Sequence, residues 1–276
     1  AEIWDINPEL LEPDLFTSSM NYPFAMAVLD FVGDVKTKIT PSQFTDQLGA
    51  VIDSYGLTTV ARLQDLIDSH DTDRLPSILM NPDRNYDREA RPDQHHGKYD
   101  ISKPGRKIKR LQKLIVALQA TWVGAPMIYY GDEVGMWGED DPGARKPMLW
   151  DDISYEAENH HPLGHARKED SVELDLDLRD YYRRAFRIRH EHSALRGGDY
   201  DVFLIDDDKE VFGFKRWNDE ETLLVITNNS DQPQKVNLES YSPFSVVFSL
   251  GECQVSTPNA IEMEGRSFLL LASNAE

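Results

Sequence analysis

The sequence of 276 residues contains a single cysteine, Cys253, and no apolar run long enough to cross a membrane. One cysteine cannot form an internal disulfide, and it cannot supply the paired thiolates of a zinc or iron–sulfur cluster. A transmembrane helix needs about 20 predominantly apolar residues in succession, so no membrane partner is predicted. We expect Cys253 to behave as a small buried hydrophobic residue in a strand region.

Basic residues are also scarce. The chain has 29 Lys and Arg against 49 Asp and Glu, which gives a net charge of −20. A field of this sign repels phosphate backbones, so nucleic acid is not an expected partner, whereas a neutral carbohydrate is indifferent to it. The length is enough for a full eightfold barrel, or for a smaller domain followed by another.

The chain also begins without methionine, and it shows no signal peptide. Residue 1 already lies in a predicted strand. We therefore expect the chain to be the C-terminal part of a longer protein, and its compartment stays open between the cytoplasm and a periplasmic or secreted location.

Two kinds of periodicity divide the sequence. Up to about residue 195, strands are predicted at 1–4, 14–20, 62–68 and 127–130, with helices over 24–31, from Pro41 onward, over 105–122 and over 176–192. Thr40 is the expected N-cap of the second helix, with Pro41 at its first position. From Asp199 onward, short strands follow one another without helices, at 202–205, 211–214, 223–226, 246–248 and 268–271. This second part is typical of an antiparallel sandwich.

Acidic residues follow three of the predicted strands in the first part. They lie in the stretches 1–5, 66–74 and 125–133. Because rigid strands hold the loops at their C-terminal ends in place, α/β enzymes carry their chemistry there. Any one of these stretches could also be a polar loop that caps the next helix. Three such ends in one chain favour a functional site.

Four segments, in this order along the chain, resemble the α-amylase family of glycoside hydrolases. They are Glu2-Ile3-Trp4, Ser69-His70-Asp71-Thr72, the stretch 124–133 and the stretch 141–150. The last is similar to the cyclomaltodextrinase, neopullulanase and maltogenic amylase branch. The resemblance implies that residues 1–196 form the C-terminal half of a (β/α)8 TIM barrel, strands five to eight. Residues 197–276 would form an all-β antiparallel sandwich domain.

The resemblance also implies roles for individual residues. Glu2 would be the general acid/base, and Asp71 would be a second catalytic acid that stabilises the oxocarbenium-like transition state. His70 would donate a hydrogen bond to the same sugar. Without the resemblance, Glu2 would be read as a surface acid near a terminus. No residue of this chain is assigned as the family's nucleophilic aspartate, so the chain alone is expected to be inactive.

Further substrate contacts are predicted for Trp4, Arg74, Asp141 and Arg145. Trp4 would stack on an acceptor sugar, with a core tryptophan as the alternative. The two arginines could hold the carboxylates of the site or close loops through salt bridges. Asp141 could contact sugar hydroxyls or cap a turn.

These expectations define an α-glucan hydrolase that cleaves α-1,4 linkages of maltooligosaccharides, cyclodextrins or pullulan, with α-1,6 linkages left open. The alternatives are a non-catalytic carbohydrate-binding relative and a transglycosylase, isomerase or branching enzyme of the same family. No cofactor is predicted. A half-barrel exposes sheet edges, so we expect it to associate with itself or with its missing half.

Histidines gather in two of the loops, at His95-His96 and at His160-His161 with His165. Their spacing matches no standard zinc motif, so we read them as ordinary loop residues and predict no metal site. The polar segment 75–103 is too long for a simple connection, which favours a loop at the rim of a substrate site.

Overall fold

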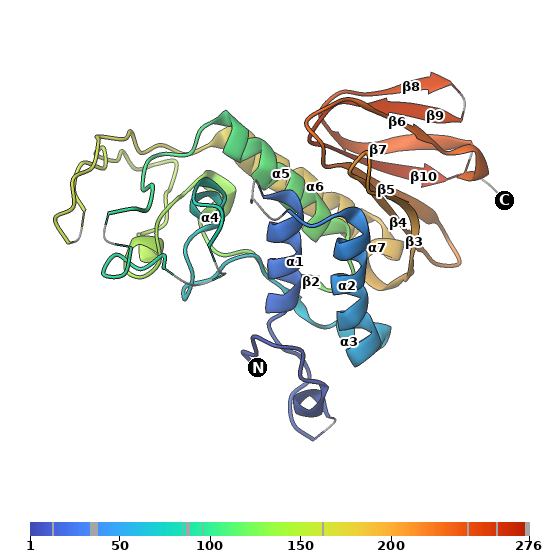
Figure 1. Cartoon of the computed structure of the whole chain (residues 1–276), viewed down its shortest axis with the longest axis horizontal. Coiled ribbons are helices and arrows are strands. Elements are labelled where there is room, and N and C mark those ends of the chain that lie inside the picture. Colours follow the sequence, from blue (N-terminus) through green and yellow to red (C-terminus); the bar gives the residue numbers. More distant parts are fainter. Residues whose placement is uncertain are drawn as a thin grey trace.

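The computed structural model describes residues 1–12, 14–33, 38–84, 86, 89–95, 97–161, 163–241, 243–257 and 259–273. Helices occupy the middle of the molecule, the C-terminal sheets lie at one end, and long irregular segments lie at the other (Figure 1). The N-terminal segment projects below the helices. His96 lies outside the described residues.

The helical part contains elements of very different length. The α-helices are α1 Tyr22–Val32, α2 Pro41–Tyr55, α3 Leu57–Val60, α4 Leu75–Met80, α5 Arg106–Thr121, α6 Leu176–Glu191 and α7 Ser193–Gly197. Short 3₁₀ turns are η1 Pro8–Leu11, η2 Asp132–Val134, η3 Gly143–Arg145 and η4 Glu239–Tyr241. The longer helices α1, α2, α5 and α6 confirm the periodicity. Thr40 caps α2 as predicted, because its side chain accepts from Gln43 N and the Gln43 side chain accepts from Thr40 N.

Short stretches of parallel backbone pairing connect the segments between these helices. Strand β1, Gln64–Asp65, pairs in parallel with β2, Ala125–Pro126. Met20 forms a parallel bridge to Gln64 on the other side. The next segment is Ala1, whose amino group donates to Ser18 O at 2.8 Å and whose carbonyl accepts from Met20 N at 2.9 Å. Four segments therefore lie side by side.

The predicted strands were too long. Residues 1–4 and 14–19 form no strand, and residues 8–11 form η1. Leu15 and Phe16 are exposed at 59% and 49%, and their N–H groups donate within the same segment, to Glu12 O and Leu10 O, rather than to a neighbouring strand. A strand is stabilised by a neighbouring segment that hydrogen-bonds its backbone N–H and C=O groups. Strand pairing therefore forms only where such a segment runs alongside, as it does at Met20. The strand predicted over 127–130 begins two residues earlier and is short, at Ala125–Pro126.

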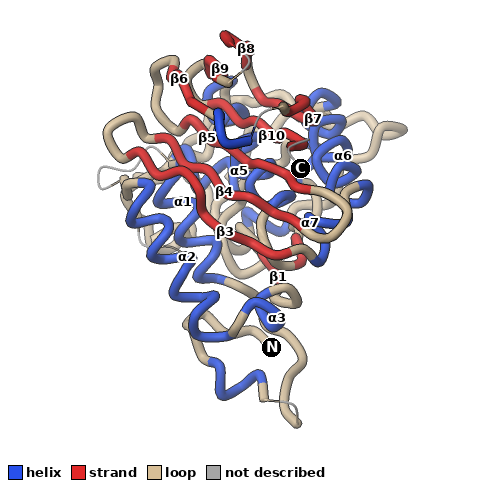
Figure 2. Tube along the Cα trace, turned by 90° about the vertical axis from the view of Figure 1, so that its right-hand side faces the viewer, coloured by secondary structure: helices blue, strands red, loops and turns tan. Residues whose placement is uncertain are grey.

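The C-terminal part consists of two antiparallel sheets (Figure 2). Their strands are β3 Asp199–Asp206, β4 Val211–Trp217, β5 Thr222–Asn228, β6 Gln234–Asn237, β7 Phe244–Leu250, β8 Cys253–Thr257, β9 Ala260–Met263 and β10 Ser267–Ser273. The larger sheet has the order β3-β4-β5-β10-β7 and the smaller one β6-β9-β8. Ile226 and Leu269 of the larger sheet share a buried core with Ile261 and Met263 of the smaller one. Cys253 is half-buried at its edge, and burial raises the pKa of its thiol to about 11.

The other face of the larger sheet packs on the helices. Phe212 of β4 contacts Phe44 of α2 edge-on, with ring centroids 5.1 Å apart, and both belong to the main core. The buried Arg216 of β4 donates to Thr121 O and Trp122 O at the end of α5, at 3.1 and 3.0 Å. Sheet and helices are therefore joined by apolar packing and by hydrogen bonds from a buried cation. Within the described residues, no helix combines the length and the apolar character that a membrane span requires.

Candidate active site

The loop Ser69–Arg74 follows β1 and is held in shape by its own hydroxyl groups. Ser69 N donates to Thr72 Oγ1 at 2.9 Å, and Asp71 N donates to Ser69 Oγ at 3.1 Å. Thr72 is buried, whereas His70 and Asp71 keep side-chain exposures of 55% and 39%, with His70 Nε2 3.4 Å from Asp71 Oδ2. The buried residues Ser69 and Thr72 thus hold the loop so that the side chains of His70 and Asp71 are exposed to solvent.

Tyr22, at the start of α1, connects this loop with Glu2. Its hydroxyl donates to Glu2 Oε1 at 3.1 Å and also hydrogen-bonds the Ser69 side chain. Burial raises the pKa of Tyr22, the bond with Ser69 opposes this, and the carboxylates of Glu2 and Asp71 add to it. Both predicted catalytic acids therefore lie near one phenol.

Trp4 lies against the same phenol. Its indole stacks on Tyr22 with ring centroids 3.8 Å apart and planes inclined by 10°. The Tyr86 ring lies 5.8 Å from that of Trp4. Trp4 is half-buried, so Tyr22 covers one face of the indole while part of the side chain stays accessible.

A second loop brings Asp141 and Arg145 to Asp71. Arg145 Nη2 donates to Asp71 Oδ1 at 3.0 Å, and Arg145 Nε lies 3.3 Å from Asp141 Oδ1. The side chains of all three are about two-fifths exposed. Three of the predicted substrate contacts, His70, Asp141 and Arg145, thus converge with the predicted catalytic acid Asp71 on one exposed surface.

Arg74 does not share that surface. Its side chain is fully buried, with Nη1 3.1 Å from Asp132 Oδ1 and 2.7 Å from Tyr130 O. Its guanidinium carbon lies 4.5 Å from the centre of the Tyr129 ring, a cation–π distance. The sugar contact predicted for Arg74 does not fit this burial, but the predicted pairing with a carboxylate is present.

Asp68 completes the group around Arg74. Its Oδ2 accepts from Leu75 N at 2.7 Å, and its carboxyl group hydrogen-bonds that of Asp132. Burial raises the pKa of both aspartates, and the charge of Asp68 raises that of Asp132 further. Two adjacent buried carboxyl groups retain one proton, so we assign one negative charge opposite Arg74. This neutral group joins the ends of β1 and β2 beneath the exposed loop.

Asp73, one residue before Arg74, is a separate buried acid. The Tyr99 hydroxyl donates to its Oδ2. Burial raises the pKa of Asp73 to about 7, although the bond from Tyr99 opposes this shift. Asp73 therefore titrates close to neutral pH.

The structure also brings together histidines that were predicted to be ordinary loop residues. His95 and His161 are buried and contact Glu139 from opposite sides, and their possible ligand atoms lie within 4.8 Å of one another. The His165 ring lies 4.6 Å from that of His161, whereas His160 is exposed. Nothing in the local sequence around any of them signals this meeting.

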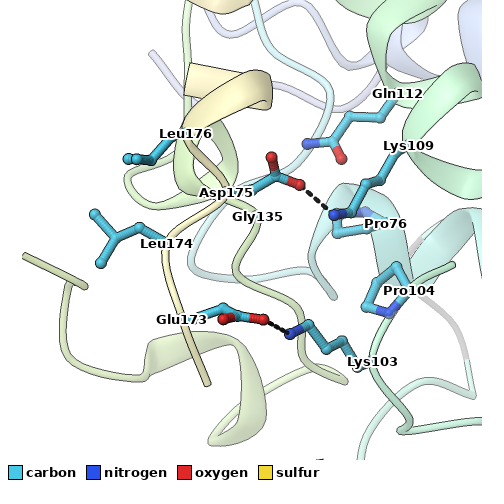
Figure 3. A pocket seen from close by; sticks show the side chains of 10 residues that line it. All are labelled: Pro76, Lys103, Pro104, Lys109, Gln112, Gly135, Glu173, Leu174, Asp175 and Leu176. Atoms are coloured by element: carbon cyan, nitrogen blue, oxygen red, sulfur yellow. Dashed lines mark hydrogen bonds and ion pairs between the residues drawn. The ribbon is translucent and has the colours of Figure 1, made fainter. Parts of the chain in front are cut away.

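A cavity of about 240 Å³ lies behind these loops, between α4, α5 and the start of α6 (Figure 3). Lys103 Nζ lies 3.0 Å from Glu173 Oε1 across it, and Lys109 pairs with Asp175. Burial opposes ionisation of Asp175, but the hydrogen bonds from Lys109 and Leu178 N and the charges of Lys109 and Lys113 together outweigh it, and the pKa of Asp175 is lowered. The charges on the walls are paired, and Glu2 and Asp71 do not line the cavity, so it is separate from the acid-lined surface.

Carboxylates presented at the ends of parallel strands, on an open surface, are typical of enzymes that act on carbohydrates. A family model described as alpha amylase, catalytic domain, matches residues 5–198. The chain therefore belongs to the α-amylase family of glycoside hydrolases, which confirms the resemblance. The family fold is a TIM barrel with β-sheet domains. Glu2 lies just outside the matched range.

Individual relatives place the chain in one branch of that family, the cyclomaltodextrinases, neopullulanases and maltogenic amylases. A cyclomaltodextrinase of Bacillus sp is 32% identical over 229 residues, which are 83% of this chain and 33% of that protein. Neopullulanase 2 of Thermoactinomyces vulgaris is 28% identical over 239 residues, 87% of this chain and 33% of that protein. The solved structure of a cyclomaltodextrinase superposes with a TM-score of 0.71 at 28% identity, covering 99% of this chain and 40% of the other. The chain thus spans about a third of the length of these curated relatives.

Proposed function

We propose that the chain supplies part of the active site of a retaining α-glucan hydrolase that cleaves α-1,4 linkages in maltooligosaccharides, cyclodextrins or pullulan. The observation that carries the proposal is the hydrogen-bonded connection from Glu2 through Tyr22 to the Ser69–Asp71 loop. It holds a carboxylic acid and a second carboxylate near one another on an exposed surface. Retaining glycoside hydrolysis needs a general acid/base and a nucleophile beside the scissile bond, and the chain supplies the first of these together with Asp71.

In this proposal Glu2 protonates the oxygen of the leaving sugar and then takes a proton from the attacking water. Asp71 accepts hydrogen bonds from the sugar at the reacting subsite and stabilises the positive charge of the transition state. Arg145 orients Asp71 by its 3.0 Å contact, and Asp141 fixes Arg145 in turn. His70 binds the same sugar, and Trp4 offers its accessible part to an acceptor.

We further propose that residues 1–196 are the half of the barrel with strands five to eight, and that residues 197–276 are a sandwich domain. The four segments paired side by side at Ala1, Met20, β1 and β2 support the first part. No residue of the chain is assigned as the nucleophile. The isolated chain is therefore expected to cleave no glucan, and to associate with a second copy or with the other half of the barrel.

Product analysis tests this function. The longer protein that contains this chain is incubated with maltoheptaose, β-cyclodextrin and pullulan, and the products are followed by chromatography. Release of shorter maltooligosaccharides with retained α-configuration supports the proposal. Products longer than the substrate identify a transglycosylase, and binding without cleavage identifies a carbohydrate-binding relative. For the isolated chain, light scattering and the same assay are combined, and a monomer that cleaves maltooligosaccharides contradicts the half-barrel proposal.

A further inference from the structure

Three side chains from distant segments meet behind the loop that carries Arg145. His95 Nε2 lies 2.5 Å from Glu139 Oε2, and His161 Nε2 lies 2.6 Å from Glu139 Oε1. Their side chains are 2%, 4% and 1% exposed for His95, Glu139 and His161. We call these three residues the His–Glu–His cluster. Each side chain has given up its water shell, so the contacts must replace it.

The backbone decides where the ring protons lie. Gly97 N donates to His95 Nδ1 at 3.0 Å, and Leu163 N donates to His161 Nδ1 at 3.1 Å. A nitrogen that accepts a hydrogen bond carries no proton, so the proton of each neutral ring is on Nε2. Both Nε2–H groups therefore face the carboxylate of Glu139. That of His161 lies close to Oε1 without the alignment of a full hydrogen bond.

This arrangement does not fit a metal ion, although two histidines and a glutamate are ligands that zinc accepts. A ligating histidine offers the lone pair of one nitrogen and donates the N–H of the other to an acceptor. Here the outer nitrogens accept from backbone N–H groups, and the inner ones bear the protons. The cluster is instead a carboxylate that contacts the Nε2–H group of His95 at 2.5 Å and lies 2.6 Å from that of His161.

Glu139 is joined to the proposed sugar site by a short length of chain. Its neighbour Gly138 accepts from Arg74 N at 3.0 Å and donates to Ser77 Oγ at 2.9 Å. On the other side, the backbone of Gly143 packs so closely that a Cβ atom there would lie 2.6 Å from Glu139 Cγ. Two residues after Gly143, Arg145 reaches Asp71.

We infer that Glu139 is a positioning residue. Held by the Nε2–H groups of His95 and His161 without a metal ion, it fixes the loop 138–145 so that Arg145 orients Asp71. This inference rests on the proposed function, since it assigns Glu139 a part in that reaction. Glu139 touches no substrate and acts through Arg145.

A double-mutant cycle on the longer protein tests the positioning. Glu139→Gln keeps the size of the side chain but turns an NH₂ group toward one of the two N–H donors. We expect it to lower kcat/KM for maltoheptaose about tenfold, with most of the loss in kcat. In an Arg145→Ala background the same change should cost less than twofold, because coupled residues are not additive. Losses that multiply would show that Glu139 does not act through Arg145, and would overturn the inference.

Variants of His161 separate the N–H donor from the ring. The amide nitrogen of glutamine can stand in for Nε2–H, so His161→Gln should retain activity within about twofold, whereas His161→Leu should resemble Glu139→Gln. His160→Gln is the matched control, because the exposed neighbour is outside the cluster. Equal losses in the glutamine and leucine variants of His161 would contradict the role of the donor.

Two further readouts need no catalysis. Amide exchange in residues 138–145 should be at least tenfold faster in Glu139→Gln and His161→Leu than in the parent and the His160→Gln control. Unchanged exchange overturns the inference even if the enzyme is active, and a parent that cleaves no glucan overturns only the proposed function. A cavity of about 210 Å³ is lined in part by Glu139 and His161, so the variants are also tested with zinc. Its addition or chelation should leave the melting temperature unchanged, and a zinc-dependent rise that His161→Leu abolishes would establish a metal site instead.

Discussion

Two arginine–aspartate pairs on neighbouring loops have opposite environments. Arg74 and Asp132 are 0% and 3% exposed, whereas Arg145 and Asp71 are 43% and 39% exposed. The contact distances, 3.1 and 3.0 Å, are almost equal. Geometry alone therefore does not separate a pair that fixes the structure from a pair that a ligand can reach. Burial does, because the unpaired charge is costly only where water is absent.

Replacing each arginine tests most directly whether burial determines how much each pair stabilises the fold. We expect Arg74→Leu to lower the free energy of unfolding by about 3–5 kcal/mol, since the buried carboxyl groups of Asp68 and Asp132 then lose the cation that Arg74 supplies. Arg145→Leu should cost less than about 1 kcal/mol, as is usual for exposed pairs. Urea unfolding of the two variants and the parent gives both values. Similar losses would mean that burial does not distinguish the pairs.

Asp71 of the exposed pair, together with Glu2, should instead affect turnover more than stability. In the longer protein proposed to contain this chain, Asp71→Asn and Glu2→Gln should each lower kcat by about 10²-fold or more, because charge stabilisation and proton transfer are separate contributions. Neither change should shift the unfolding midpoint noticeably, since both side chains are at least partly exposed. Asp132→Asn is the comparison, with stability altered more than chemistry. Parental turnover in Asp71→Asn or Glu2→Gln would remove that residue from its proposed role.

Asp73 provides a test of burial through the pH dependence of stability. Its pKa in the folded protein is raised to about 7 from an ordinary value of 3.8, so folding favours the neutral form. The stability from this group is complete below about pH 4 and is lost as the pH rises through 7. Asp73→Asn keeps a neutral acceptor for Tyr99 and removes the titration.

We therefore expect Asp73→Asn to be more stable than the parent at pH 8 and nearly equal to it at pH 4. Each tenfold change in proton affinity is worth about 1.4 kcal/mol, which sets the scale of the difference. Melting temperatures of both proteins across pH 4–8 measure it, and the difference between the curves cancels the other titrating groups. A constant difference would contradict the raised pKa.

Elements whose signals are local could be predicted from the sequence. The cap at Thr40, the apolar face of α5 and the short apolar runs of β4 and β5 depend on residues only a few positions apart. Strands β6 and β9 were missed because they have four residues each, too few to establish a period. The 127–130 stretch was misplaced because its pairing depends on β1, about 60 residues earlier in the chain.

The residues of the candidate site could likewise be predicted only in part from the sequence. Asp71, Asp141 and Arg145 were found as residue types in family-like segments, and the fold brings them together. The burial of Arg74 and the meeting of His95, Glu139 and His161 depend on how three loops pack. Spacing along the sequence contains no information about that packing.

Replacing Trp4 should have the smallest effect on catalysis, because this half-buried side chain is accessible to a sugar only in part. Tyr22 covers one face of its indole at 3.8 Å, so only the remaining surface can receive a sugar. If that surface binds the acceptor, Trp4→Ala should lower transfer to added glucose several-fold more than hydrolysis, because water needs no platform. Trp4→Phe keeps a flat apolar ring and should restore most of the ratio. The ratio of transfer to hydrolysis products, measured in the longer protein, is insensitive to the amount of folded enzyme. An unchanged ratio in Trp4→Ala would assign Trp4 to the packing around Tyr22 and Tyr86 alone.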